Sequence, residues 1–217
     1  MENTFRETGG IEAVLFDFGG VLSEEGFKNG LQAIARLNGL DEETFIKTAN
    51  DVIHACGYVI GKASESAYWE ILRGTTGIRG DDQFLRNEIL SRFRLREWMT
   101  DTVRRLKELK VCVGILSDQT NWLDELDAHD NFFRQFDHVF NSYHMGKSKK
   151  DPTHFENVVH MLETKAHMVL FIDDDPGNCA RARQAGLKVI HYRAREQFLH
   201  EIAGYFPGIA ANVRPHL

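Results

Sequence analysis

Polar side chains with catalytic potential come directly after short apolar runs of this sequence. Asp17 ends the run in "VLFDFGGVL", Ser117 and Asp118 end the run in "GILSDQ", and the acids at 173–175 end the run in "FIDDDPGN". Clustered carboxylates repel one another, so such a group needs a cation or a lysine to balance its charge at neutral pH. Because all the candidate ligands are oxygens, the pattern indicates a hard ion such as Mg²⁺.

The apolar runs are predicted to be the strands that position these side chains. Each run is short and rich in Val, Ile, Leu or Phe without alternation, which is typical of parallel strands covered on both faces. In an open parallel sheet the residues that follow the strands meet at one edge, where ligands bind near the topological switch point. The predicted strands are Ala13 to Phe16, Val111 to Leu116, Met168 to Ile172 and Val189 to Tyr192.

Helical patterns lie between the predicted strands. Apolar residues at three- and four-residue spacing predict helices over 100–109 and 152–163, with Pro152 in the first turn of the second. A third helix is expected from about 178 to 184, ending before Gly186. This alternation predicts an α/β fold with a doubly wound parallel sheet.

The segment 25–93 has a different pattern, because its apolar residues recur at helical intervals and no convincing strand is present. Loops are predicted at 57–63 and 73–82, and Ser64 is a predicted N-cap. The sequence therefore predicts an α/β core domain formed by 1–24 and 94–217, with a small helical domain formed by 25–93. Tyr58, Tyr68 and Trp69 are expected in the core of that helical domain.

Composition excludes several classes of protein. With 217 residues and 42% hydrophobic side chains, the chain can bury a sizeable core. A formal net charge of -6 without a basic block argues against a nucleic-acid partner. The three cysteines lie outside any CxxC spacing, so they predict reduced thiols in a cytoplasmic protein rather than disulfides or a zinc site. Neither a leader nor a membrane span is expected, since apolar runs are short, and no sequence marker indicates an oligomeric state.

Taken together, the polar segments resemble the four motifs of the haloacid dehalogenase-like (HAD) hydrolase superfamily. The segments "LFDFGGVL", "GILSDQ", "GKSKKDP" and "FIDDDPGNCARARQAG" occur in the family's order over residues 11 to about 195. Each motif alone is weak, but four in order at the expected strand and loop positions are a strong signal. The helical insertion resembles the cap domain of a phosphatase-type member, and the rest of the chain resembles the family's Rossmann-like core. The resemblance implies that the cap selects the substrate and that it opens and closes during turnover.

The resemblance also implies roles for individual residues. Asp17 would be the nucleophile that forms an aspartyl-phosphate, and Ser117 and Lys149 would hold the transferring oxygens and offset their charge. The expected substrate is a small phosphorylated metabolite, such as a sugar phosphate. Sequence alone does not separate Lys149 from Lys150 as the site lysine. The implied Mg²⁺ ligands are Asp17, the Gly19 carbonyl, Asp173 and Asp174, and the implied substrate-binding residues are Gly20, Ser117, Asp118 and Lys149.

Gly19 departs from the family pattern, because phosphatases of this family usually carry a second Asp there that protonates the leaving group. Loss of such a general acid costs typically about 10²–10⁴-fold in rate. The first-ranked account is a phosphatase whose substrate has a good leaving group: a sugar 1-phosphate, an aryl phosphate or an acyl phosphate. In a second account, another acid substitutes. The candidates are Glu24, Glu25 and His144.

Two further accounts change the chemistry or remove it. The chain could be a haloacid dehalogenase, although the metal-binding acids 173–175 weigh against that, or a phosphonate-cleaving enzyme that uses a cap lysine. It could also bind a phosphate ester without turnover.

Other polar residues are expected to have structural or cap roles. Asp175 is expected to cap the following helix and Asn178 to be a polar first-turn residue. The candidate cap lysines are Lys28, Lys47 and Lys62, the last in the loop with Tyr58 where a cap often meets substrate.

Overall fold

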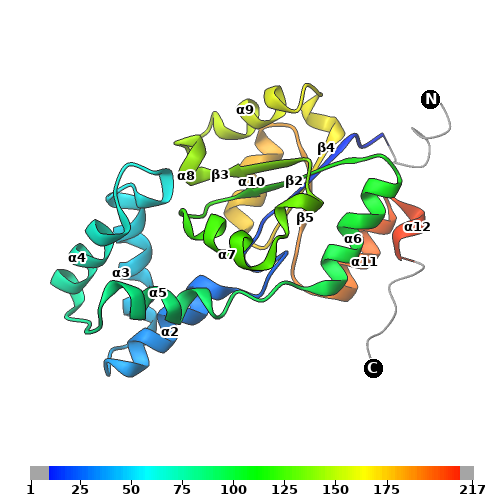
Figure 1. Ribbon diagram of the computed structural model, residues 1–217. Helices are drawn as coiled ribbons and strands as arrows, with labels where there is room; N and C mark the ends of the chain where they lie inside the picture. The colour runs from blue at the N-terminus through cyan, green and yellow to red at the C-terminus, as the bar shows by residue number, and fades with distance from the viewer. Residues whose placement is uncertain (1–9, 211–217) are drawn as a thin grey trace.

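The fold is built on one parallel sheet. The computed structural model describes residues 10–210, and within them five strands pair in the order β3-β2-β1-β4-β5, all parallel. Helices cover both faces of this sheet (Figure 1), so the predicted α/β doubly wound fold is confirmed. The strands are β1 (Ala13–Phe16), β2 (Cys112–Ser117), β3 (His138–Asn141), β4 (Val169–Asp173) and β5 (Lys188–His191).

The helices expected at 100–109, 152–163 and 178–184 are present with small shifts in their ends. The helices Trp122–Asp130, Ser142–Met145, Arg195–Ala203 and Pro207–Ala210 were not predicted from the sequence. The loop expected at 73–82 is shorter, because α4 continues to Thr76 and ends at Gly77 in the left-handed conformation. Pro152 lies two residues before α9 rather than in its first turn. The helices are α2 (Gly26–Leu37), α3 (Glu42–Ala55), α4 (Glu65–Thr76), α5 (Asp82–Leu90), α6 (Glu97–Glu108), α7 (Trp122–Asp130), α8 (Ser142–Met145), α9 (His154–Met161), α10 (Pro176–Gln184), α11 (Arg195–Ala203) and α12 (Pro207–Ala210), with single 3₁₀ turns η1 (Tyr58–Ile60), η2 (Phe133–Gln135) and η3 (Ala166–Met168).

The central strand β1 is buried on both faces. Val14 and Phe16 join the larger hydrophobic cluster, which includes side chains of α6 and α11. Ala13 and Leu15 point to the opposite face, where α9 and α10 contribute to a second cluster. Strand β1 pairs with β2 on one side and β4 on the other, with its last residue, Phe16, opposite both Ile115 and Ile172. The neighbouring strands continue only to Ser117 and Asp173, so the carboxyl ends of all three lie close together. Whatever follows these strands must therefore lie side by side.

Strand β3 is the one element of the sheet that the sequence analysis missed. Its four residues, His138–Asn141, form one edge of the sheet and pair only with β2. Two of the four are polar and the first two are half-buried, so no continuous apolar run marks this strand. An edge strand of this kind lacks the composition that identifies the central strands.

The helical segment formed by α2–α5 packs beside the carboxyl edge of the sheet (Figure 1). Tyr58, Tyr68 and Trp69 are fully buried, as predicted, and Ser64 caps α4 by accepting a hydrogen bond from the Ala67 amide. The rings of Tyr58, Tyr68 and Trp69 contact Trp122, which begins α7 in the part of the chain that follows β2. The division into domains 1–24 with 94–217 and 25–93 stays a prediction, and its outermost residues, 1–9 and 211–217, lie outside the described part of the chain.

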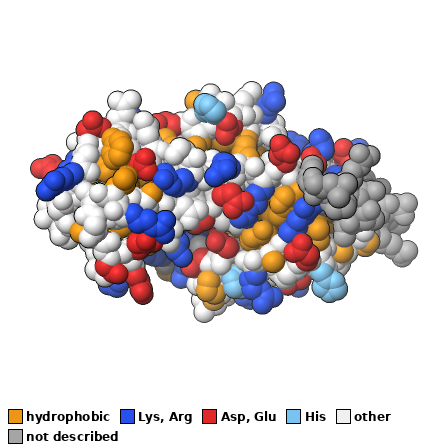
Figure 2. Space-filling model, turned by 90° about the horizontal axis from the view of Figure 1, so that it is seen from below, with side chains coloured by type: hydrophobic (Ala, Val, Ile, Leu, Met, Phe, Trp, Pro, Cys, Tyr) orange, Lys and Arg blue, Asp and Glu red, His pale blue; other side chains and the backbone are white. Residues whose placement is uncertain are grey.

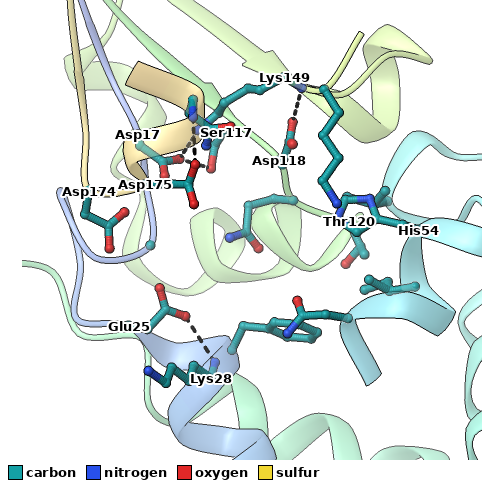
Figure 3. A pocket seen from close by; sticks show the side chains of 18 of the residues that line it. Asp17, Glu25, Lys28, His54, Ser117, Asp118, Thr120, Lys149, Asp174 and Asp175 are labelled. Carbon is teal, nitrogen blue, oxygen red and sulfur yellow. Dashed lines mark hydrogen bonds and ion pairs between the residues drawn. The ribbon is translucent and has the colours of Figure 1, made fainter. Parts of the chain in front are cut away.

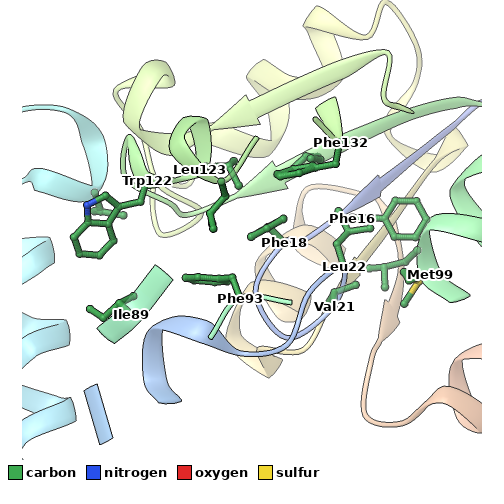
Figure 4. Close-up of a cluster of buried hydrophobic side chains, with 14 of the residues drawn as sticks. Phe16, Phe18, Val21, Leu22, Ile89, Phe93, Met99, Trp122, Leu123 and Phe132 are labelled. Carbon is green, nitrogen blue, oxygen red and sulfur yellow. The ribbon is translucent and has the colours of Figure 1, made fainter. Parts of the chain in front are cut away.

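Trp122 joins the helical segment to the sheet. Its indole stacks on Trp69 at 5.9 Å between ring centroids and meets Tyr58 edge-on at 5.7 Å. The Tyr58 hydroxyl donates a hydrogen bond of 2.6 Å to the Asn121 side chain. Trp122 belongs to the same continuous cluster as Phe18, Phe93 and the residues beneath the sheet (Figure 4). The segment and the sheet therefore share one hydrophobic core.

The surface carries mixed charge. On the face shown in Figure 2, acidic and basic side chains of the described residues alternate over short distances. The three cysteines are free thiols. No helix among residues 10–210 is both long and apolar enough to cross a membrane.

We expect Trp122→Ala to lower the free energy of unfolding by about 3–5 kcal/mol, because a fully buried indole is replaced by a cavity. Leu37→Ala is the control: that side chain is 63% exposed, so its loss should change stability by no more than about 0.5 kcal/mol. Denaturant unfolding followed by circular dichroism measures both. Equal, small effects of the two substitutions would contradict a shared core across this interface.

Candidate active site

The site is assembled at the carboxyl ends of β1, β2 and β4. Asp17 follows β1, and its Oδ1 accepts hydrogen bonds from the Phe18 amide at 2.8 Å and the Ser117 hydroxyl at 2.6 Å. The Lys149 ammonium lies 2.8 Å from the same Oδ1 and 2.6 Å from Oδ2 of Asp173. Four residues singled out in the sequence, spread over positions 17 to 173, thus form one contact network. Figure 3 shows three of them, Asp17, Ser117 and Lys149.

Burial makes this network electrostatically strong. The side chains of Lys149 and Asp173 are 1% and 0% exposed, so neither charge is stabilised by water and each depends on the other. Burial opposes the charged form of Lys149, but Asp17 and Asp173 outweigh it and raise the pKa of the ammonium. Burial and Asp173 raise the pKa of the Asp17 carboxyl to about 8, against the opposing effect of Lys149. The charge balance at Asp17 therefore favours an additional cation.

The lysine that enters the site is Lys149, and its backbone is fixed at both ends. The Lys149 amide donates to Oδ1 of Asp118 at 2.8 Å, and the Lys149 carbonyl accepts from Nε of Arg181 at 2.8 Å. Lys150 is exposed at the rim of the cavity. Burial raises the pKa of Asp118, opposed by Lys149. Asp118 thus orients Lys149 and also borders the cavity. Its substrate-binding role stays a prediction.

Two residues of α10 complete the network and were not assigned a role from sequence. The side-chain Nδ2 of Asn178 donates to both carboxylate oxygens of Asp173, at 3.3 and 3.1 Å. Arg181, one turn later on the same helix, also donates to the Asn178 side chain at 2.5 Å. Asp175 caps α10 as predicted, because its side chain accepts a hydrogen bond from the backbone N–H of Asn178. The sequence pattern that could have predicted this pair is the spacing of Asn178 and Arg181, two polar residues one helical turn apart after an acidic run.

Carboxylate oxygens of Asp17, Asp173 and Asp174 lie within 4.8 Å of one another. Burial, Asp173 and Glu25 raise the pKa of Asp174 to about 6. Repulsion of this kind between acids is relieved by a divalent cation. Three convergent carboxylates fit a hard ion such as Mg²⁺. Because Asp173 is already saturated by protein donors, Asp17 and the more exposed Asp174 are the better placed of the three to contact an ion.

The loop after Asp17 depends on Gly20 for its shape. Gly20 has a φ of +77°, and a Cβ there would overlap the Asp174 carboxylate. The Gly20 carbonyl accepts a hydrogen bond from the Arg96 guanidinium. Gly19, in contrast, borders the cavity in ordinary backbone geometry, with room for a Cβ at 3.4 Å from its nearest neighbour. The substrate-binding role expected for Gly20 and the ligand role of the Gly19 carbonyl stay predictions.

A cavity of about 810 Å³ lies above the network, between the sheet edge and helices α2 and α3. Most of the side chains that line it are polar, and they include the carboxamide residues Asn29, Gln32, Asn50 and Gln119. Of the three candidate cap lysines, Lys28 borders the cavity, whereas Lys47 is exposed and pairs with Asp51 at 3.4 Å. Lys62 is exposed and packs near Gly57, and it is not part of the cavity wall.

Comparison with known proteins identifies the family of the chain. The sequence profile of the haloacid dehalogenase-like hydrolases matches residues 11–186. The chain belongs to this family. A HAD family enzyme of Bacteroides thetaiotaomicron has a similar structure, with a TM-score of 0.72, 24% identity, and coverage of 88% of this chain and 98% of that one. Another structure of that enzyme, in complex with magnesium and inorganic phosphate, gives a TM-score of 0.71 at 20% identity over the same shares.

The chain is also similar to two other proteins. L-2-haloacid dehalogenase of Xanthobacter autotrophicus, with chloropropionic acid covalently bound, gives a TM-score of 0.63 at 19% identity, covering 94% of this chain and 85% of that one. Bifunctional epoxide hydrolase 2 of Rattus norvegicus is 30% identical over 89 residues, which is 38% of this chain and 16% of that protein. The chain therefore matches only a small part of that curated relative.

Protons and Mg²⁺ should compete for the acid cluster. Because the pKa values of Asp17 and Asp174 are raised to about 8 and about 6, we expect Mg²⁺ affinity to fall at least about tenfold as the pH is lowered from about 8 to about 5. Isothermal titration calorimetry measures this. Asp174→Asn should weaken binding at high pH, whereas Asp175→Asn, which keeps its helix cap, should not. Affinity that is constant over this range would contradict the assignment.

Proposed function

We propose that this HAD-like hydrolase is a Mg²⁺-dependent phosphatase that acts on a small phosphorylated metabolite through an aspartyl-phosphate on Asp17. The observation that carries the proposal is the placement of the Asp17 carboxylate at the floor of a polar cavity, held by Ser117 and Lys149. Such an arrangement supplies a fixed nucleophile and fixed positive charge, which are the main requirements of phosphoryl transfer.

Asp17 would attack with a carboxylate that is fixed by the contacts of Phe18, Ser117 and Lys149 on Oδ1. The bond between phosphorus and the ester oxygen breaks as the bond to a carboxylate oxygen of Asp17 forms, and the ester oxygen leaves with the electron pair and takes up a proton. Water then attacks phosphorus, releases inorganic phosphate and restores the Asp17 carboxylate. Ser117 and Lys149 would stabilise the charge on the transferring oxygens in both steps.

Mg²⁺ would be held by Asp17, Asp174 and the Gly19 carbonyl, with Asp173 as a further ligand or as the anchor of Lys149. When bound, the ion supplies positive charge that offsets the phosphoryl oxygens. The fit of three carboxylates within 4.8 Å supports this assignment, and magnesium together with phosphate is found in the Bacteroides thetaiotaomicron enzyme. The ion would also lower the raised pKa of Asp17, which must be ionised to attack.

The substrate is proposed to be small and hydrophilic. The cavity offers carboxamides, hydroxyls and charged groups that hydrogen-bond to a polyol, so a sugar phosphate is our leading candidate. Free thiols suit a reducing compartment, and we propose a cytoplasmic location. Lys28 at the cavity wall is the remaining support for phosphonate cleavage, and the structural likeness to a haloacid dehalogenase keeps that reaction as the second candidate.

Hydrolysis of p-nitrophenyl phosphate tests the proposal. We expect turnover with Mg²⁺ that is lost on addition of EDTA, and a loss of at least about 10⁴-fold in Asp17→Asn, because no covalent intermediate forms without the carboxylate. Asp175→Asn should stay close to the wild type. Halide release from 2-haloacids without metal would instead support the dehalogenase, and tight phosphate-ester binding without either activity would indicate a binding protein.

A further inference from the structure

Hydrolysis of a phosphate ester needs a group that moves protons. The departing alcohol must receive a proton, and the attacking water must lose one. Gly19 has no side chain for either task. Three of the acids at the cavity floor have partners: Asp17 contacts Ser117 and Lys149, Asp118 accepts from the Lys149 amide, and Asp175 caps α10. Asp174 also borders the cavity, and the proposed function assigns it to the ion. The proton carrier must therefore come from another part of the cavity wall.

Glu25 occupies the space that Gly19 leaves open. Its Oε2 lies 3.4 Å from the position of a Cβ on Gly19, nearer than Phe93 at 3.5 Å and the Gln119 amide nitrogen at 3.6 Å. The other oxygen, Oε1, accepts a hydrogen bond of 3.1 Å from the Lys28 amide, because Glu25 is the N-cap of α2. This bond fixes the carboxylate, which points toward the nucleophile loop and Asp174 (Figure 3).

The other two acid candidates from the sequence point elsewhere. Glu24 is bound by the Arg96 guanidinium at 3.0 and 3.1 Å, and its side chain is 53% exposed. His144 contacts Asp124 at 2.7 Å on the surface. Neither residue borders the cavity that contains Asp17, whereas Glu25 does. Geometry alone thus separates Glu25 from its neighbour in the sequence.

We propose that Glu25 is the acid and base of the reaction, acting in place of a side chain at position 19. In the first step the Glu25 carboxyl gives its proton to the ester oxygen as the bond between that oxygen and phosphorus breaks. In the second step the Glu25 carboxylate takes a proton from water as the water oxygen bonds to phosphorus and the bond to Asp17 breaks. Both residues end in their starting states. This role rests on the proposed phosphatase activity.

If Glu25 is the general acid, the effect of removing it should depend on the leaving group of the substrate. A nitrophenolate departs without protonation, but an alkoxide does not, so loss of the acid should be felt most on alkyl phosphates. The test compares the wild type, Glu25→Gln and Glu24→Gln, each with Mg²⁺, on glycerol phosphate and on p-nitrophenyl phosphate. Gln keeps an oxygen that can accept from the Lys28 amide, and Glu24→Gln is the matched control on the adjacent residue.

We expect Glu25→Gln to lose about 10²–10⁴-fold in turnover of glycerol phosphate, whereas Glu24→Gln stays within about threefold of the wild type. With p-nitrophenyl phosphate, Glu25→Gln should release a first equivalent of nitrophenol at nearly the wild-type rate and then stall. The stalled enzyme should carry phosphate on Asp17, because water is no longer activated, and acid quenching with labelled substrate detects this adduct. A residue with a merely structural role would slow both steps alike.

A rescue variant keeps the test informative if Glu25→Gln is poorly folded. Since a Cβ at position 19 has room, Gly19→Asp placed in the Glu25→Gln background should restore turnover of glycerol phosphate at least about tenfold. Wild-type activity on both esters with an unaffected Glu25→Gln variant would overturn the role of Glu25 alone. A wild type that hydrolyses neither ester would overturn the phosphatase proposal and the role of Glu25 together.

Discussion

The buried ion pairs of Lys149 are the interaction on which the rest of the site depends. An ammonium with 1% exposure is tolerable only where carboxylates surround it, so Asp17, Asp173 and Lys149 hold one another in place. Asp118 and Arg181 fix the backbone of Lys149 from opposite sides, and Asn178 fixes Asp173. Removing the Lys149 ammonium would leave the Asp17 and Asp173 carboxylates buried without their shared cation. The network thus joins four separate segments of the chain at one floor.

The sheet supplies the geometry that this network requires. Because β1 lies between β2 and β4 in parallel register, Asp17 is placed between the last residues of its two neighbours. Gly20 then lets the chain turn against Asp174, where any larger residue would overlap the carboxylate. Above this floor, packing around Trp122 places α2 against the cavity. The hydrophobic core thus determines the position of the substrate cavity as well as the stability of the fold.

Sequence patterns predicted much of this arrangement for physical reasons that differ from element to element. The central strands were evident because burial on both faces demands continuous apolar runs, whereas β3 escaped notice because an edge strand such as His138–Asn141 is half polar. Asp17 and Ser117 could be identified because they lie at the ends of predicted strands. Lys149 could be identified because it belongs to one of four family motifs that occur in the expected order. The contacts of Asn178 and Arg181 were not, because they depend on the angle of α10 against the sheet. The choice between Glu24 and Glu25 likewise depends on the direction of one helix cap.

The position of Glu25 at the first turn of α2 has an evolutionary consequence. The same helix carries Lys28, Asn29 and Gln32 at the wall of the cavity. Under the proposed function, this one short element would both contact the departing half of the substrate and present a carboxylate to the bond that breaks. The nucleophile and its lysine belong to a different layer of the molecule. Mutations that reshape α2 can therefore change which alcohols are accepted while the phosphate end of the reaction is left intact, and lineages that diverge in this helix would diversify in substrate before they diversify in chemistry.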